Sequence, residues 1–411
     1  MSRLADLINE LCPDGVEYKN IGSFADCVAG ATPKTTDPTF WDGDIPWMSS
    51  GEVNKGTVYS TDRFITKAGY DSCSTKMVPP GAVVIALAGQ GKTRGTVART
   101  RIELCTNQSL CSILPQECVN SDFLYHFLAG EYDNLRAVSS GDGTRGGLNL
   151  KMIRAYKVPV PPLEVQREIV KILDQFTTLE AELEAELEVR RRQYEYYRNQ
   201  LLSYDALVSR CPNGVQYKSI GSFSKCVAGA TPNSKNPSLW DGDIPWMSSG
   251  EVNKKTVYST NRFITQLGFD SCSTKMVPAG AVVIALAGQG KTRGTVARIR
   301  IELCTNQSLC AIITDKTVDS DYLFHYLSGQ YDNLRAVSSG DGTRGGLNLK
   351  MIRAYKVPVP PIEEQRRIAD VLDRFDALVN DISSGLPAEI AARRAQYEYY
   401  RDRLLSFPEK K

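Results

Sequence analysis

The sequence is poor in the residues that catalysis and metal binding usually require. It has only two histidines, His126 and His325, in 411 residues. It contains no Cys-x-x-Cys pair, no His-Glu-x-x-His and no Gly-rich dinucleotide loop followed by an acidic residue. We therefore expect no metal, no cofactor and no catalytic residue in this chain, and we predict that both histidines are structural.

Long apolar runs are also missing. No stretch reaches 18 consecutive apolar residues, and residues 1–11 lack a basic region followed by a long apolar core. We therefore predict neither a membrane span nor a secretory signal, and we expect a cytoplasmic protein of a bacterium or archaeon. Ten of the 11 cysteines form repeat-related pairs such as Cys27 and Cys226, and Cys118 has no counterpart. This arrangement favours buried, reduced thiols over disulfides.

Net charge is low, at +2, but it is distributed unevenly. Segment 163–201 carries nine acids and six bases, and segment 362–405 carries nine acids and seven bases, which leaves the rest of the chain at +7. The basic surplus thus lies outside these two segments, where it could form a surface that faces phosphates.

An internal duplication decides the architecture. Segment 41–99 aligns with 240–298 over 59 residues with six differences, at an offset of 199 residues. Segment 132–162 is identical to 331–361 over all 31 residues. A repeat of this length is too long for a solenoid unit, so each copy is predicted to be a complete domain followed by a helix.

The helix prediction rests on apolar spacing after Pro161-Pro162, where the chain runs without Gly or Pro as far as residue 201. Apolar residues recur there at spacings of three and four, which is the seam of a coiled coil. The stripe and its counterpart in the second copy are Ile169, Ile172, Phe176, Leu179 and Leu183, and Ile368, Val371, Phe375, Leu378 and Ile382. We favour two helices that pack on each other; a helix packed on its own domain is the alternative.

The predicted fold class is α+β. Two tandem mixed α/β domains, 1–162 and 202–361, are each followed by a long helix, at 163–201 and 362–411, and the two helices form an antiparallel coiled coil. The second helix should be kinked near 384–387, because it contains Gly385 and Pro387. Within the first domain, Val83–Leu87 and Ser109–Leu114 are predicted strands and Ser121–Leu135 is a predicted helix.

One motif imitates a nucleotide-binding loop. Segment 86–93, Ala-Leu-Ala-Gly-Gln-Gly-Lys-Thr, follows a predicted strand and fits a relaxed phosphate-loop pattern. Such a loop must open a helix whose N-terminus holds the phosphate, but residues 94–100 are poor helix formers. A DNA-stimulated NTPase is therefore a weak alternative, which would require hydrolysis by the isolated chain.

The same segment has the composition of a loop that faces DNA. Residues 89–95 combine flexible backbone with Lys, Arg, Gln and Thr side chains, which can contact base edges or phosphates. Segments 139–147 and 47–55 are further candidates, although Trp47 itself is predicted to be core and each loop could be only a solvated tip. The predicted DNA-binding residues are Gln90, Lys92, Thr93, Arg94, Arg99, Lys55 and Arg145, with their counterparts Gln289, Lys291, Thr292, Arg293, Arg298, Lys254 and Arg344.

An ordered set of motifs occurs in both copies. In the first copy these are Cys-Pro-Asp-Gly-Val at 12–16, Gly-Ala-Thr-Pro at 30–33 and Trp-Asp-Gly-Asp-Ile-Pro-Trp at 41–47. Thr-Asn-Gln-Ser, Gly-Thr … Leu-Asn-Leu and a Pro-Pro-x-x-x-Gln junction into the long helix follow, at 106–109, 143–150 and 161–166. With these motifs the chain resembles the DNA-specificity subunit of type I restriction–modification systems over nearly its whole length.

The resemblance implies a non-catalytic role. Two target-recognition domains would each read half of a split site in double-stranded DNA, and the helices would act as a spacer that docks two methyltransferase (modification) subunits. Restriction endonuclease subunits could then join, and the methyl donor and ATP would belong to these partners. The chain departs from the family in having two nearly identical recognition domains, so we expect the two half-sites to be alike. The main alternative is a freestanding DNA-binding regulator with no methyltransferase partner.

Overall fold

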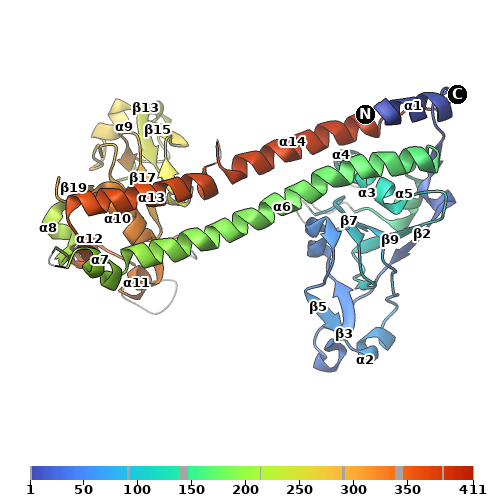
Figure 1. Cartoon of the computed structure of the whole chain (residues 1–411), viewed down its shortest axis with the longest axis horizontal. Helices are drawn as coiled ribbons and strands as arrows, with labels where there is room; N and C mark the ends of the chain where they lie inside the picture. The colour runs from blue at the N-terminus through green and yellow to red at the C-terminus, as the bar shows by residue number, and fades with distance from the viewer. Residues whose placement is uncertain are drawn as a thin grey trace. The chain divides into compact units, whose positions relative to one another are not determined.

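The computed structural model describes residues 2–89, 93–138, 147–212, 214–288, 292–337, 346–381 and 384–410. The chain divides into two compact units (Figure 1). Unit 1 comprises Met1–Leu183 and Ile390–Lys411, and unit 2 comprises Glu184–Glu389. Each unit thus contains one copy of the globular repeat, the start of the helix that follows it and the end of the other long helix.

The globular part of unit 1 is α+β. Its strands form a five-stranded sheet in the order β2-β9-β6-β7-β4, a three-stranded sheet in the order β5-β3-β8 and the pair β1-β10. The strands are β1 (Tyr18–Asn20), β2 (Ala25–Ala29), β3 (Trp41–Met48), β4 (Thr57–Val58), β5 (Arg63–Ile65), β6 (Val83–Ala86), β7 (Val97–Thr100), β8 (Cys105–Thr106), β9 (Leu110–Pro115) and β10 (Lys157–Pro159). The helices are α1 (Ser2–Leu11), η1 (Ile21–Ser23), η2 (Pro38–Phe40), η3 (Ser50–Lys55), α2 (Lys67–Asp71), α3 (Ser121–Gly130), α4 (Tyr132–Ala137) and α5 (Leu150–Ala155).

Unit 2 repeats this topology with the sheet orders β12-β19-β16-β17-β14, β15-β13-β18 and β11-β20. Its strands are β11 (Gln216–Ser219), β12 (Ser224–Ala228), β13 (Trp240–Met247), β14 (Thr256–Val257), β15 (Arg262–Ile264), β16 (Val282–Ala285), β17 (Val296–Ile299), β18 (Cys304–Thr305), β19 (Leu309–Thr314) and β20 (Lys356–Val359). Its helices are α7 (Tyr204–Arg210), α8 (Ile220–Phe223), η4 (Pro237–Leu239), η5 (Ser249–Lys254), α9 (Gln266–Asp270), α10 (Ser320–Ser328), α11 (Tyr331–Ala336) and α12 (Leu349–Ala354).

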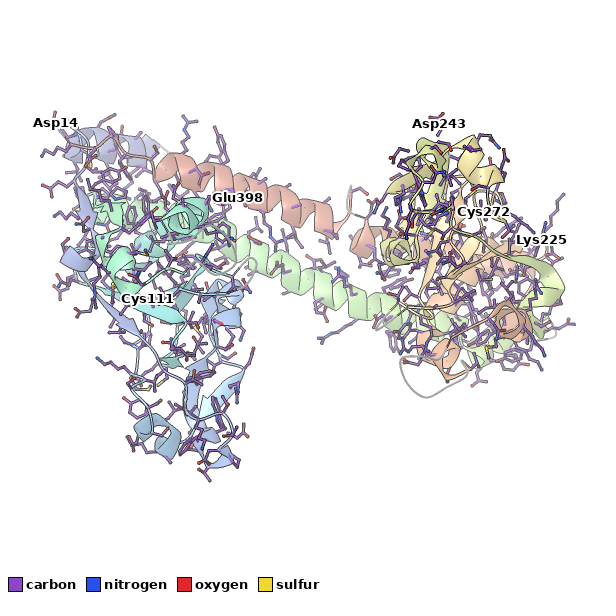
Figure 2. All side chains as sticks on the ribbon, turned by 180° about the vertical axis from the view of Figure 1, so that it is seen from behind. Asp14, Cys111, Lys225, Asp243, Cys272 and Glu398 are labelled. Atoms are coloured by element: carbon purple, nitrogen blue, oxygen red, sulfur yellow. The ribbon has the colours of Figure 1, made fainter. Side chains whose placement is uncertain are left out.

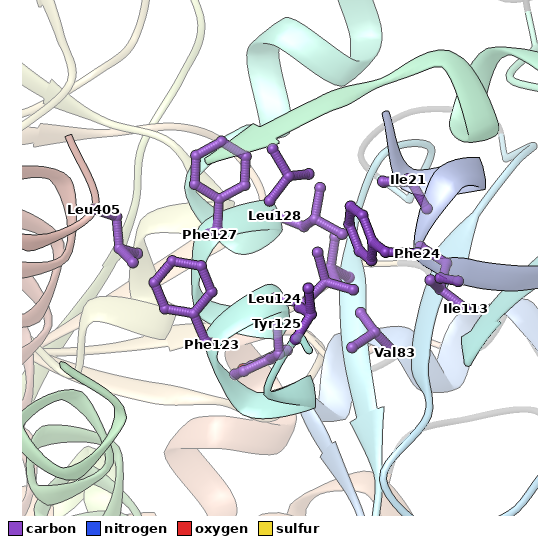
Figure 3. Packing of buried hydrophobic residues seen from close by; sticks show 14 of the residues in the cluster. Ile21, Phe24, Val83, Ile113, Phe123, Leu124, Tyr125, Phe127, Leu128 and Leu405 are labelled. Atoms are coloured by element: carbon purple, nitrogen blue, oxygen red, sulfur yellow. The ribbon is translucent and has the colours of Figure 1, made fainter. Parts of the chain in front are cut away.

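Strand β6 shows why the five-stranded sheet has an unbroken apolar sequence. Successive side chains of a strand point to opposite faces, and both faces of this sheet are buried. Val83 and Ile85 join the cluster that α3 closes (Figure 3), whereas Val84 and Ala86 join a second cluster on the opposite face. The predicted strands at 83–87 and 109–114 are confirmed as β6 and β9.

Three long helices connect and complete the units. They are α6 (Leu163–Leu202), α13 (Ile362–Asn380) and α14 (Leu386–Leu404). Helix α6 is continuous over 40 residues, whereas the second helix is interrupted between α13 and α14, next to Gly385. Pro387 lies in the first turn of α14, where its missing N–H has no helical partner to lose.

The long helices pair antiparallel within each unit, as predicted. In unit 1, Phe176 of α6 stacks on Tyr400 of α14 at 5.3 Å between ring centroids, and Glu180 forms an ion pair with Arg394. In unit 2, Tyr197 of α6 lies 5.6 Å from Phe375 of α13. The start of α6 also packs on its own domain, since Ile169 belongs to the unit 1 core. The start of the apolar stripe therefore packs on its own domain, and the later part packs on the other long helix.

Two sequence predictions need revision. The helix predicted over 121–135 is broken at Glu131 into α3 and α4, directly after Gly130. All 11 cysteines are free, but Cys118 is exposed and Cys73, Cys211 and Cys272 are only half-buried. Cys111, by contrast, lies in the interior of unit 1 (Figure 2).

Among the described residues, no helix is both long and apolar enough to span a membrane.

Candidate nucleic-acid interface

The loop predicted to face DNA lies between two paired strands. Strand β6 ends at Ala86 and its antiparallel neighbour β7 begins at Val97. No helix begins in the described residues between them, so the geometry of a phosphate loop is missing there. Gly89 has φ +154°, and a Cβ at this position would approach the Cβ of Thr93 to 2.9 Å. The base of this loop therefore requires glycine.

Several predicted contact residues fall outside the described residues. These are Gln90, Lys92 and Arg145 of the first copy, and Gln289, Lys291 and Arg344 of the second. Thr93 and Thr292 are described and half-buried at the end of their loops. Arg94 and Arg293 are buried, each 7% exposed. A DNA contact by either arginine would require its side chain to leave the domain interior.

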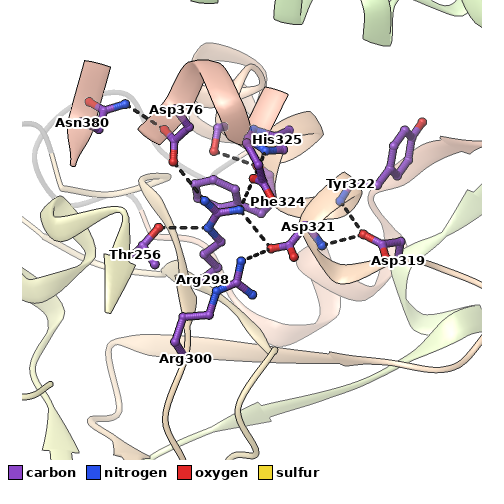
Figure 4. A network of polar contacts seen from close by, with 12 residues as sticks. Thr256, Arg298, Arg300, Asp319, Asp321, Tyr322, Phe324, His325, Asp376 and Asn380 are labelled. Carbon is purple, nitrogen blue, oxygen red and sulfur yellow. Dashed lines mark hydrogen bonds and ion pairs between the residues drawn. The ribbon is translucent and has the colours of Figure 1, made fainter. Parts of the chain in front are cut away.

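The prediction that Arg99 and Arg298 face DNA is corrected by the structure. Arg99 is 6% exposed, and its guanidinium donates to Asp122 at 3.0 Å and to Asp174 of α6 at 2.7 Å. Arg298 is equally buried and pairs with Asp321 and Asp373, and with Asp376 at 3.0 Å (Figure 4). These arginines join the sheet of each unit to the long helix that follows it.

The single histidine of each copy belongs to the same network, which confirms its structural role. His126 is fully buried, with Nε2 3.0 Å from Asp174 Oδ1 and Nδ1 2.8 Å from the hydroxyl of Tyr397. A neutral imidazole satisfies both contacts, because Nε2–H donates to the carboxylate and Nδ1 accepts from the tyrosine. His325 has the same partners in unit 2, Asp373 and Tyr194.

The charges in this network shift the pKa values of its members. Burial alone would raise the pKa of Asp174, but the hydrogen bond with His126 and the guanidinium of Arg99 hold it at about 2. Burial also lowers the pKa of His126, despite its hydrogen bond with Asp174. The network therefore contains an ionised carboxylate, an arginine and a neutral histidine. Such a set of groups is suited to holding the sheet and the long helix together, and not to acid–base catalysis.

Lys55 and Lys254 are held by their own loops. The ammonium of Lys55 lies 2.9 Å from Glu52, 2.8 Å from Asp62 and 3.3 Å from the carbonyl of Ser60. Since an ammonium has three donors, these contacts use its full capacity. Lys254 has an equivalent set, with Asn261 in place of Asp62. Both lysines are better explained as supports of η3 and η5 than as DNA contacts.

In the three-stranded sheet an arginine side chain lies over the ring of a tryptophan. This arginine was not among the predicted DNA-binding residues. Trp47 is buried as predicted, and it meets Trp41 edge-on at 5.1 Å. The exposed Arg63 places its guanidinium 3.7 Å from the ring centroid of Trp41. Arg262 and Trp240 repeat this contact in unit 2. Only pairing of β3 with β5 brings these residues together, so spacing along the chain could not reveal them.

The paired helices carry exposed tyrosines. Tyr196 and Tyr399 occupy equivalent positions and are 60% and 58% exposed. Each meets the next tyrosine edge-on, at 5.5 Å for Tyr196–Tyr197 and 5.3 Å for Tyr399–Tyr400. An aromatic ring held by its neighbour and open to solvent loses little conformational entropy on binding, which is typical of protein interfaces. Each unit therefore presents one such surface on its helix pair.

The fold and these surfaces define a class of protein: a tandem of two equivalent α+β units, each completed by an antiparallel helix pair. The profile of the family described as the type I restriction modification DNA specificity domain matches residues 13–189 and 212–392. The chain therefore belongs to this family.

Individual relatives agree with the family match. The specificity subunit of the Escherichia coli type I restriction enzyme EcoR124I/EcoR124II is 38% identical over 262 residues, which cover 61% of this chain and 63% of that protein. The alignment thus spans less than two thirds of that relative. A putative type I restriction enzyme specificity subunit of Haemophilus influenzae, S.HindORF215P, is 31% identical over 71% of this chain and 74% of its own length.

A solved structure shares the fold. The S subunit of a type I restriction–modification system from M. genitalium superposes with a TM-score of 0.59 at 14% sequence identity. The match covers 95% of this chain and 96% of that one. Tandem domains joined to paired helices are thus an architecture that this chain shares with a known S subunit.

Proposed function

We propose that this chain is the DNA-recognition subunit of a type I restriction–modification complex and reads a bipartite site. The observation that carries the proposal is the duplication within a member of the specificity family: the same domain occurs twice, and each copy is fixed to the helix pair by the same buried network. Two copies of one reading domain suit a site made of two like half-sites.

On the DNA side, the remaining candidates are the loop residues Gln90, Lys92 and Thr93, Arg145, and their counterparts in the second copy. Cationic and amide side chains in glycine-rich loops can reach both phosphates and base edges. Arg63 and Arg262 add one exposed cation to each unit, held in place by a tryptophan.

On the protein side, the tyrosine surfaces are the candidate docking sites for two modification subunits, one in each unit. The helices that carry them belong to segments of net negative charge, which suits a protein partner better than it suits DNA. Restriction subunits would join through this assembly. The chain itself performs no catalysis, the methyl donor and ATP act in the partners, and the complex works in the cytoplasm, where the host DNA is.

Co-purification with the modification subunit tests this assignment. Tyr196→Ser with Tyr399→Ser should weaken retention of the methyltransferase by the tagged chain at least tenfold. Tyr59→Ser with Tyr258→Ser is a matched control, because these tyrosines are also exposed, at 69% and 70%, but lie in the globular parts. Its retention should equal that of wild type. A wild-type chain that binds DNA but retains no methyltransferase would favour the freestanding regulator.

A further inference from the structure

The two units differ at one place where four substitutions meet. Most differences between the repeats are scattered, but these four surround the buried arginine that joins the sheet to the long helix. They are Gly56 and Lys255, Tyr125 and Phe324, Thr177 and Asp376, and Ala181 and Asn380. Asp376 binds Arg298 at 3.0 Å, and Asn380 accepts from the ammonium of Lys255 at 3.2 Å. The second copy thus carries a connected set that the first copy lacks.

Lys255 occupies a backbone conformation that normally requires glycine. Its φ is +58°, close to the +64° of Gly56 at the same position of unit 1. A Cβ on Gly56 would lie 3.2 Å from the hydroxyl of Tyr125, and in unit 2 the residue at that place is Phe324, which has no hydroxyl. Non-glycine residues in this region persist where the side chain has a use that outweighs the strain. A lysine at this strained position therefore points to a use for its side chain.

Charges of both signs surround Lys255. Burial of its ammonium lowers the pKa of Lys255, and the nearby Arg191 and Arg198 of α6 lower it further, against the opposite effect of Asp376 and Glu195. In the described part of the chain, no carboxylate lies within ion-pair distance of Lys255, Arg191 or Arg198. Lys254, one residue earlier, has Glu251 at 2.9 Å. Among the described residues Lys255 uses one of its three ammonium donors on Asn380, so its other donors can serve an anion in the pocket.

A pocket of about 220 Å³ opens at this cluster. Lys255 and Arg198 line it together with Glu195, and Gly294–Val296 form another part of its wall. These three residues follow directly on the loop 289–293, which is the proposed DNA-facing loop of unit 2. The cluster therefore adjoins the base of the proposed DNA-facing loop.

We infer that Lys255, with Arg198, binds a phosphate group in unit 2, and that this group belongs to the backbone of the DNA duplex. The inference rests on the proposed function, which supplies the duplex. Unit 1 has glycine at the equivalent position, so it cannot make this contact. The two nearly identical domains are then unequal binders: unit 2 has one additional phosphate contact, which carries no sequence information.

Salt-dependent DNA binding tests the inference. The full chain is titrated with a 40-base-pair duplex of random sequence at NaCl concentrations from 50 to 200 mM. Lys255→Gly should make the slope of log K against log [NaCl] shallower by about 0.9, the value for one phosphate contact in duplex DNA. Between those salt concentrations this corresponds to about a threefold smaller loss of affinity. The variant should fold at least as well as wild type, because glycine suits the positive φ.

Lys225→Gln is the control, since this exposed lysine of β12 (Figure 2) carries the same charge and does not line the pocket. Its slope should equal that of wild type, and an equal fall in both variants would contradict a local contact. An unchanged slope in Lys255→Gly, with wild type binding the duplex, overturns the inference but leaves the proposed function intact. If wild type binds no duplex, the proposed function fails first and the inference with it.

A second arm distinguishes a DNA phosphate from a free one. Inorganic phosphate at 10 mM is added in thermal unfolding of wild type and Lys255→Gly at constant ionic strength. We expect no stabilisation that depends on Lys255. A rise in Tm of wild type alone, together with an unchanged DNA slope in the variant, would identify a free-anion site and overturn the assignment to DNA.

Discussion

At the scale of single residues, the most informative feature is the buried chain Tyr–His–Asp–Arg in each unit. Arg99 and His126 are nearly inaccessible, yet each has a charged or polar partner, as buried polar groups require. Their partners come from two different long helices, Asp174 from α6 and Tyr397 from α14. One small network therefore ties a globular domain to both helices of its pair.

Removal of one hydroxyl should show how much this network contributes to the free energy of unfolding. Tyr397→Phe leaves Nδ1 of His126 buried without its donor, which should lower the free energy of unfolding of unit 1 by about 1–3 kcal/mol. Chemical denaturation followed by Trp fluorescence measures this change. Tyr399→Phe, at an exposed tyrosine of the same helix, should change stability by less than about 0.5 kcal/mol. Equal effects of the two substitutions would show that the buried hydrogen bond is not what matters.

The loop lysines should act on DNA and not on folding. Lys92→Ala with Lys291→Ala is expected to weaken duplex binding at 100 mM NaCl while Tm stays within about 2 °C of wild type. A contact with a base edge should make the loss, about 1–3 kcal/mol per contact, depend on the sequence of the site. A phosphate contact should instead weaken all duplexes alike and flatten the salt slope. Unchanged affinity for every duplex would place these loops away from DNA.

At the scale of elements, the important feature is that each unit is completed by the C-terminal part of a long helix that begins in the other unit. Most of helix α14 belongs to unit 1, although the whole of unit 2 precedes that part of the chain, and the second half of α6 belongs to unit 2. Leu405 and Phe407 are buried in the core of unit 1, where Leu405 lies beside α3 in Figure 3. The chain terminus also continues this contact, since Val16 N donates to the carbonyl of Pro408.

Truncation after Glu389 should therefore unfold the domain at the opposite end of the sequence. Loss of buried Leu405 and Phe407 alone removes roughly 3–6 kcal/mol from unit 1, which is comparable with the total stability of many domains. Hydrogen exchange with mass spectrometry should show loss of protection in β6, β9 and α3, while β16, β19 and α10 of unit 2 stay protected. Protection retained in both units would mean that α14 is dispensable for unit 1.

The sequence predicted the helices and strands better than it predicted the side-chain contacts between them. Apolar runs, helical periodicity and Gly385 with Pro387 located β6, β9, the long helices and the break between α13 and α14, because these features depend on local sequence. The burial of Arg99 could not be predicted, because an arginine in a strand next to a glycine-rich loop is normally expected to be exposed on the surface. Its partner Asp174 lies 75 residues away and comes into reach only when α6 packs on the domain. The Arg63–Trp41 stack depends in the same way on strand pairing.

At the scale of the whole molecule, the duplication gives the protein two equivalent units, and the longest of the described helices, α6, runs from the first into the second. Helix α6 starts in unit 1 and ends in unit 2, and at 1.5 Å per residue its 40 residues span about 60 Å. We therefore expect the length of this helix to help set the number of base pairs between the half-sites.

Shortening α6 by one turn tests this expectation. Deletion of Leu183–Glu186 removes four residues, close to the 3.6 of one turn, so the apolar seam keeps nearly the same face. The variant should fold and prefer a DNA spacer that is shorter by one base pair, or two at most, since about 6 Å of helix is lost. Methylation of a library of sites with varied spacers, by the variant with its modification subunits, measures the preference. An unchanged preferred spacer with intact activity would show that this helix does not measure the gap.

The most direct test of the central claim is the methylome of a host with and without this gene. We predict that the gene adds one bipartite motif whose half-sites have the same sequence on opposite strands, because the two readers differ at few positions and the helices that carry them pair antiparallel. Single-molecule sequencing detects such a motif whatever its base sequence. No change in methylation, or a motif with two unrelated half-sites, would contradict the account of two equivalent DNA readers.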